Sequence, residues 1–221
     1  MDYNDFLNNN LVQEQYNKID LINPYALNHG MKHVKNVCNI MENLCDLLKI
    51  DNLQKDALLI ACALHDVGQV NGREKHGTKS KEFIVKELND ELNNNIFYND
   101  ILESIEKHSD INAKDLSLFC ILVQFADKAD FTKNRLEDNY KEKFKYYCYE
   151  DINKIDFIYT DEEFGINIIT NNIENFDELF LKEGHPKKIL KVTENLANKL
   201  NRKPVIMHNG KHLIFYCNKE G

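Results

Sequence analysis

The sequence predicts a mainly α-helical protein with a small C-terminal α+β appendage. No proline occurs between Pro24 and Pro186, and through most of the first 150 residues the apolar residues recur at spacings of three and four. That spacing is typical of amphipathic helices. From about Asn153 onward, apolar and polar residues alternate instead, which is the period of a β-strand. We therefore expect a helical domain at 1–151 and the appendage at 152–221.

Five helices are predicted in the helical domain. Each has one apolar face, and their ranges are 24–50, 51–69, 76–92, 98–110 and 113–131. Asp51 is suited to cap the second helix, because its carboxylate can accept hydrogen bonds from the first free backbone amides. Gly68 lies near the end of the same helix, where glycine commonly terminates helices.

The appendage carries two hairpin signals and one helix. Residues 154–170 alternate around the turn-like stretch "TDEEFG", which predicts a β-hairpin. Residues 185–202 predict a helix with Pro186 at its start. Asn209-Gly210 interrupts the apolar residues of 204–217, and Asn-Gly between apolar runs is typical of a hairpin turn.

Composition excludes several classes of function. The net charge of the 221 residues is −8, so general binding to the nucleic-acid backbone is not expected. The six cysteines form no close CxxC pair, which favours free thiols in a reducing, cytoplasmic setting. The first fifteen residues lack the basic and apolar regions of a secretory signal, and no apolar run is long enough to cross a membrane.

The stretch "CALHDVGQVNGREKHG" interrupts an apolar run with a histidine and a carboxylate and adds a second histidine soon afterwards. Further histidines and an aspartate lie on the neighbouring predicted helices or at their ends. Imidazoles with carboxylates suit manganese or iron, with zinc or nickel as alternatives. We expect one or two divalent transition-metal ions bound by His33, His65, Asp66, His76, His108 and Asp127.

Each of these residues also has an ordinary structural interpretation. His65 and Asp66 would suit a capped helix end, and His76 and His108 would suit exposed helix termini. We favour metal binding because the residues occur together.

Two carboxylates compete on the fifth predicted helix. Asp127 follows an apolar run, where it would bind metal or pair with Lys128 or Arg135. Asp130, one helical turn on, is expected to pair with a lysine or arginine at the surface.

Two histidines likewise compete on the first predicted helix. His29 lies four residues before His33 and shares its face if the helix includes both. We assign the ligand role to His33.

The ordered set His33, His65-Asp66 and Asp127 resembles the signature of the HD-domain metal-dependent phosphohydrolases. The stretches "KHVKNV", "ALHDVG", "KHGTKSKEF", "SIEKHSD" and "FADKADFTKNR" are similar to family blocks and occur in the family's order. The resemblance covers roughly 25–136. It implies an HD-type all-helical bundle, in agreement with the periodicity.

The resemblance also implies a binuclear site, because His76 and His108 match the extended ligand set of binuclear members. Asp66 would then bridge two ions. The implied reaction is hydrolysis of a phosphomonoester or phosphodiester in a nucleotide or related small molecule, by metal-activated water. Gln69 stands where some members carry a phosphate-contacting lysine. A cyclic-dinucleotide esterase of that subgroup is therefore disfavoured.

Positive charge for the phosphate must come from other side chains. The candidates are Arg73, Lys79, Lys128, Lys133 and Arg135. We expect Asp66 and Lys128 to act in catalysis. Two other functions remain open, a di-iron oxygenase on the same scaffold and a nucleotide sensor without turnover. The sequence also leaves open whether the protein forms a homodimer.

Overall fold

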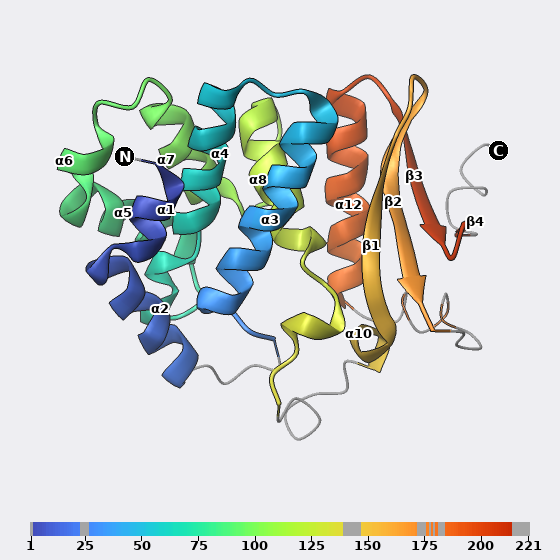
Figure 1. Cartoon of the computed structure of the whole chain (residues 1–221), viewed down its shortest axis with the longest axis horizontal. Helices are drawn as coiled ribbons and strands as arrows, with labels where there is room; N and C mark the ends of the chain where they lie inside the picture. The colour runs from blue at the N-terminus through green and yellow to red at the C-terminus, as the bar shows by residue number, and fades with distance from the viewer. Residues whose placement is uncertain are drawn as a thin grey trace. The chain divides into compact units, whose positions relative to one another are not determined.

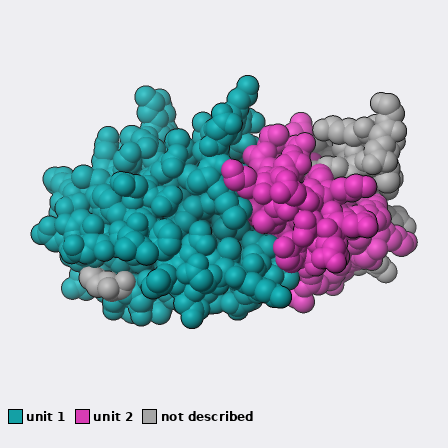
Figure 2. All heavy atoms as spheres, turned by 90° about the horizontal axis from the view of Figure 1, so that it is seen from above, with its two compact units in different colours: residues 1–24, 28–130 teal, residues 25–27, 131–221 magenta. Residues whose placement is uncertain are grey.

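The computed structural model describes residues 2–22, 27–138, 147–171, 176, 178, 180 and 184–213 (Figure 1). Ten α-helices and one four-stranded sheet occur in this part of the chain, which confirms the predicted fold class. The chain forms two compact units, coloured separately in Figure 2. One comprises 1–24 and 28–130, and the other comprises 25–27 and 131–221. The domain boundary expected at 151 stays a prediction.

The five predicted helices of the first unit all form. They are α3 (Met31–Leu48), α4 (Asn52–Leu64), α5 (His76–Glu87), α7 (Tyr98–Lys107) and α8 (Leu118–Ala129). A 3-10 helix, η1 (Val67–Asn71), follows α4, and the short α6 (Asn89–Leu92) follows α5. Asp51 caps α4 as expected, accepting from the amides of Leu53 and Gln54 at 3.1 Å each.

Two helices precede these and are not predicted by the sequence analysis. They are α1 (Tyr3–Asn8) and α2 (Asn10–Ile22). Their buried apolar side chains are mixed with asparagines, charged residues and the exposed Leu11, Leu21 and Ile22, so the periodic signal is weak. Phe6, Val12, Tyr16 and Ile19 are nevertheless buried, which makes this segment part of the core.

Helix α4 lies at the centre of the first unit. Every residue from Ala57 to Leu64 is buried, and the helix contacts α1, α3, α7 and α8. Helix α8 is buried from Phe119 to Ala129. Helices apolar on all sides need neighbours on all sides. These two therefore form a rigid floor, and polar side chains at their ends are held in fixed positions.

The second unit contains the predicted α+β elements. It comprises η2 (Lys133–Arg135), α10 (Tyr147–Asp151), α12 (Gly184–Lys199) and strands β1 (Ile152–Tyr159), β2 (Glu163–Thr170), β3 (Lys203–His208) and β4 (Lys211–His212). The strand order is β1-β2-β3-β4. Strands β1 and β2 form the expected antiparallel hairpin, and β2 runs parallel to β3.

The second hairpin also forms as expected. Strands β3 and β4 pair around Asn209 and Gly210, whose φ angles are 47° and 78°. Positive φ at both positions is what a type I′ turn requires, and asparagine and glycine tolerate it best. Residues 214–217 of that predicted segment lie outside the described part. Helix α12 begins at Gly184, so Pro186 falls in its first turn.

The five cysteines in the described part of the chain are free and buried. Cys217 lies outside the described residues. None of the helices that the structure describes is long and apolar enough to cross a lipid bilayer.

Gly68 sets the distance between η1 and α5, so we expect Gly68→Ala to destabilise the fold. Its amide donates to the Ser80 hydroxyl at 2.9 Å. A Cβ at Gly68 would lie 2.2 Å from the backbone nitrogen of Ser80, and backbone cannot move aside like a side chain. Overpacking of this kind costs about 1–3 kcal/mol of unfolding free energy, measurable by urea denaturation. Ser80→Ala, as a control, loses only the hydrogen bond, worth about 1 kcal/mol. An equal loss in both variants would contradict the steric explanation.

Candidate metal centre

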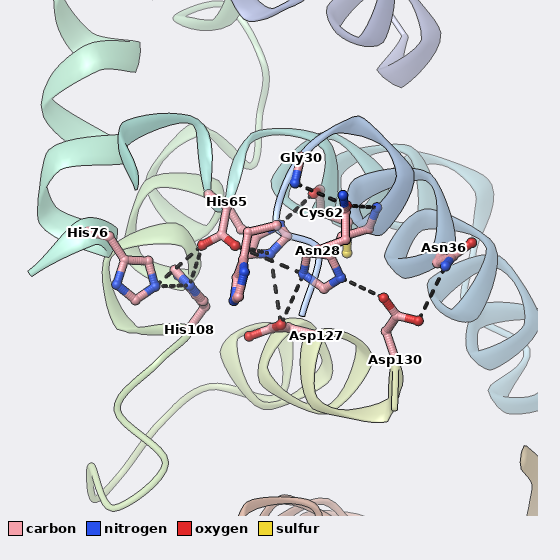
Figure 3. A network of polar contacts seen from close by, with 12 residues as sticks. Asn28, Gly30, Asn36, Cys62, His65, His76, His108, Asp127 and Asp130 are labelled. Carbon is pink, nitrogen blue, oxygen red and sulfur yellow. Dashed lines mark hydrogen bonds and ion pairs between the residues drawn. The ribbon is translucent and has the colours of Figure 1, made fainter. Parts of the chain in front are cut away.

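The six side chains assigned to metal binding by the sequence meet in one cluster. They come from different helices or their ends, and Figure 3 labels four of them. In that view His76 and His108 lie on one side of the cluster and Asp130 lies on the other. The six are His33 on α3, His65 and Asp66 after α4, His76 at the start of α5, His108 after α7, and Asp127 on α8.

Three of the histidines are oriented by the backbone. His65, His76 and His108 each donate from Nδ1 to the carbonyl of the residue three positions earlier, over 2.7–2.8 Å. Since a carbonyl only accepts, Nδ1 carries a proton, which leaves Nε2 as the nitrogen that can bind a metal ion. All three Nε2 atoms face Asp66. The helix ends thus fix the tautomer that a metal ion needs.

The fourth histidine is oriented by a carboxylate. His33 Nδ1 lies 2.6 Å from Oδ2 of Asp130, whose Oδ1 accepts from the Asn36 amide at 3.3 Å. Asp130 is 3% exposed. The expected position of Asp130 at the surface is therefore wrong. The chain leaves helical geometry after Ala129, and the carboxylate contacts α3.

His29 does not share the helix of His33, because α3 begins at Met31. Its ring centroid lies 6.0 Å from that of His33, and its Nε2 lies 3.4 Å from Nη2 of Arg73. His29 thus lies beside the cluster rather than among the groups that face Asp66.

Asp66 lies between two pairs of histidines. Its Oδ2 is 3.4 Å from Nε2 of His65 and 3.9 Å from Nε2 of His33. Its Oδ1 is 3.3 Å from Nε2 of both His76 and His108. One carboxylate oxygen therefore faces each pair, which is the arrangement of a bridging ligand.

Asp127 completes the group on the His33 side. Its Oδ1 lies 3.3 Å from Nε2 of His33 and 3.9 Å from Nε2 of His65. Its Oδ2 accepts a hydrogen bond from the ammonium of Lys128, which is buried beside it. The ion pair with Lys128 and the position facing the histidines therefore occur together.

Both carboxylates are ionised at neutral pH. Burial by itself raises the pKa of Asp66, but His65, His108 and His76 favour its charged form and leave the pKa well below its usual range. Burial likewise raises the pKa of Asp127, and Lys128 with the neighbouring histidines more than reverses this. Burial also lowers the pKa of His108 to about 4, so that its imidazole is neutral.

The donor set fits divalent transition-metal ions. Among the described residues, Nε2 of His65 and Oδ1 of Asp66 are buried without a hydrogen-bond partner. The Nε2 atoms of His76 and His108 lie 2.9 Å apart, where two lone pairs repel unless a cation lies between them. Two groups have ligand atoms within 4.8 Å of one another: His33, His65 and Asp127, and His65, Asp66 and His108. Buried polar atoms without partners are costly, and a metal ion would satisfy them.

Gly77 allows the second histidine pair to meet, and the sequence analysis did not identify it. A Cβ on Gly77 would lie 2.4 Å from the carbonyl oxygen of Glu106. Helices α5 and α7 therefore touch backbone to backbone beside His76 and His108. The only sequence signal is a glycine directly after a candidate ligand, in "KHG".

Gln124 holds the turn after α7 and was also missed. Its side-chain amide donates to the carbonyls of Lys107 and Asp110 at 2.9 Å each. These carbonyls flank His108 in the turn after α7, where each also accepts one backbone amide. A buried glutamine on an apolar helix is a weak signal, since its role depends on a turn seventeen residues away.

Three of the predicted phosphate-binding cations lie near the cluster, and one of them, Lys128, is the partner of Asp127 described above. Arg73 is exposed, and its carbonyl is the acceptor that orients His76. Lys79 donates to the carbonyls of residues 71 and 72 at 2.7 and 3.4 Å, at the end of η1. Arg73 is thus at the rim of the cluster, whereas Lys79 orders the turn that carries Arg73.

Lys133 and Arg135 belong to the second unit. Lys133 donates to Asn153 at 3.0 Å, and Arg135 is buried. The positions of the two units relative to one another are not determined. A role of these two residues in substrate binding stays a prediction.

Asp130 controls the tautomer of His33, so its removal should weaken metal binding. We expect Asp130→Ala to reduce Mn²⁺ affinity about 10- to 100-fold, the usual effect of losing a carboxylate behind a histidine ligand. Asp130→Asn keeps an oxygen that can accept from Nδ1 and should lose less. Calorimetric titration of the metal-free protein measures both. Wild-type affinity in Asp130→Ala would show that the carboxylate does not orient a ligand.

Comparison with known families supports this arrangement. Residues 30–132 match the family model described as HD domain, and this range contains all six clustered residues. No curated protein compared with the chain matches it. The resemblance to the HD domain is confirmed. Residues 30–132 of this chain therefore resemble the HD domain, and the HD family is one of metal-dependent phosphohydrolases.

Proposed function

We propose that the protein is a metal-dependent phosphohydrolase with two divalent ions in this centre. Its substrate is a phosphomonoester or phosphodiester of a nucleotide or a related small molecule. The match of residues 30–132 to the HD domain supports the reaction class. The proposed ligands are His33, His65 and Asp127 for one ion, His76 and His108 for the other, and Asp66 for both.

The position of Asp66 is the observation that carries the proposal. Its two oxygens face separate histidine pairs at 3.3–3.9 Å, and both histidine pairs present Nε2 lone pairs toward it. A carboxylate needed only for charge balance would require one partner. Two sets of donors around one carboxylate support two ions.

The reaction needs little beyond what this centre supplies. Divalent ions bound here would lower the pKa of a water molecule and neutralise the charge on a phosphoryl group. Lys128 keeps Asp127 ionised and oriented, since its ammonium binds the oxygen that does not face the histidines. No side chain has to form a covalent bond to the substrate.

The substrate approaches on the side of His76. That side chain is 15% exposed, whereas the other five proposed ligands are 4% exposed or less. Arg73 lies on the same side and is exposed, with its backbone tied to His76. Its guanidinium can bind two phosphate oxygens at once. We assign it the main phosphate contact.

The ligand chemistry favours manganese or iron, with zinc or nickel as alternatives, because imidazoles outnumber carboxylates. The free buried thiols suit a reducing compartment, and we place the protein in the cytoplasm.

Metal content tests the proposed ligand sets. Protein purified without chelator and under low oxygen should contain two transition-metal ions per chain, measured by elemental analysis. The double variant His76→Ala/His108→Ala should retain one ion, and Asp66→Ala should lose phosphate release by at least about 10³-fold, since both ions depend on it. Two ions in the double variant would contradict the assignment. If the protein consumed oxygen and released no phosphate, an oxygenase would replace the hydrolase as the proposed function.

Substrate kinetics test the role of Arg73. Loss of a charge-assisted phosphate contact is worth about 1.5–3 kcal/mol, so Arg73→Ala should raise KM about 10- to 100-fold with metal content unchanged. Lys86→Ala is the matched control. Lys86 is an exposed cation on the same helix as His76, about 15 Å further along it. If both variants raised KM equally, Arg73 would contribute only to the overall positive charge and would not contact the phosphate.

A further inference from the structure

Helix α2 lies outside the matched residues 30–132, yet it reaches the metal centre. Its Tyr16 is fully buried, and the hydroxyl donates to the carbonyl of Ala63 at 2.9 Å. Ala63 lies in the last turn of α4, two residues before His65. Helix α2 also packs against η1, which follows Asp66. The tyrosine therefore contacts the turn that carries two proposed ligands.

A second link runs from α2 to the start of α3. The Asn28 amide donates to Oδ1 of Asp20 at 3.0 Å. Oδ1 of Asn28 accepts from the backbone amides of Gly30 and His33 at 3.1 Å each. A Cβ on Gly30 would lie 1.9 Å from Oδ1 of Asp20, so only glycine lets this carboxylate approach the helix.

We propose that α2 is a positioning element of the metal centre. Tyr16 fixes the turn of His65 and Asp66, and Asp20 acts through Asn28 on the first turn that carries His33. The inference rests on the proposed metal site and adds residues outside the HD domain to it.

The physical basis lies in the unpaired groups of helix ends. The last carbonyls of α4 have no intrahelical partner. That of Cys62 accepts from His65 Nδ1 at 2.8 Å, and the next, Ala63, accepts from Tyr16. Without the tyrosine hydroxyl, a buried carbonyl is left unsatisfied and the turn can relax. The imidazole held by the neighbouring carbonyl would then lose its orientation.

The same reasoning applies at α3. The amide of His33 is among the first amides of the helix, which lack intrahelical acceptors. Asn28 supplies the acceptor from outside the helix, and Asp20 holds the Asn28 amide in the orientation that points its oxygen inward. Loss of the Asp20 oxygen removes one of the contacts that orient the Asn28 side chain.

The test is the Mn²⁺ affinity of the full chain, measured by calorimetric titration alongside the melting temperature of metal-free protein. We expect Tyr16→Phe to weaken Mn²⁺ binding at least tenfold, in line with other residues that orient metal ligands. The control is Tyr3→Phe, which removes a 2.8 Å hydrogen bond to Glu42 and should change affinity less than twofold.

A second pair of variants separates positioning from stability. Asp20→Ala removes the acceptor and should weaken Mn²⁺ binding several-fold, whereas Asp20→Asn retains an oxygen and should restore wild-type affinity. If Tyr16→Phe does not fold, this pair of variants tests the positioning role of α2 instead.

The outcomes are distinct. A Tyr16→Phe protein with a lowered melting temperature but wild-type affinity would overturn the role of Tyr16. Wild-type affinity in Asp20→Ala would overturn that of Asp20. Either result leaves the metal site standing. A wild-type chain that binds no Mn²⁺ would remove the metal site, and the role of α2 with it.

Discussion

The burial of two ionised carboxylates is the constraint on which the rest of the first unit depends. Asp66 and Asp127 are each about 3% exposed, and a buried charge is tolerated only with compensating partners. Four imidazoles and the ammonium of Lys128 surround them. Bringing these groups together requires five helices to converge on one point, which the buried helices α4 and α8 make possible.

Backbone groups at helix ends orient most of the histidine side chains in the cluster. His65 and His108 follow helices and bond to carbonyls of the last turn, which helices leave free there, whereas His76 begins α5 and bonds to the carbonyl of Arg73 in the preceding turn. These backbone carbonyls, which would otherwise need hydrogen bonds from water, therefore orient the imidazoles. His33 lies in the first turn of α3, where the carbonyl three residues earlier, that of Gly30, already accepts from Val34, and the carboxylate of Asp130, just after α8, pairs with its Nδ1 instead. Ligands within helices thus need outside support, whereas ligands at helix ends are oriented locally.

The local sequence pattern predicted the fold class, five helices and both hairpins, because the spacing of apolar residues and the turn residues determine these elements. It also predicted which six residues gather, although their roles as ligands stay a proposal. It missed α1 and α2, because their four buried apolar residues are mixed with exposed apolar and polar ones, which weakens the periodicity. It misplaced Asp130 because the partner, His33, is 97 residues away, and no local signal reports such a pairing.

The direct contact of α5 and α7 at Gly77 has a consequence for metal selectivity. Side chains change rotamer to fit ions of different size, but two touching backbones cannot. The spacing between the backbones that carry His76 and His108 is therefore fixed. In the proposed centre, an ion such as Ca²⁺, which takes six to eight oxygen ligands at roughly 2.3–2.6 Å, would find mostly imidazole nitrogens.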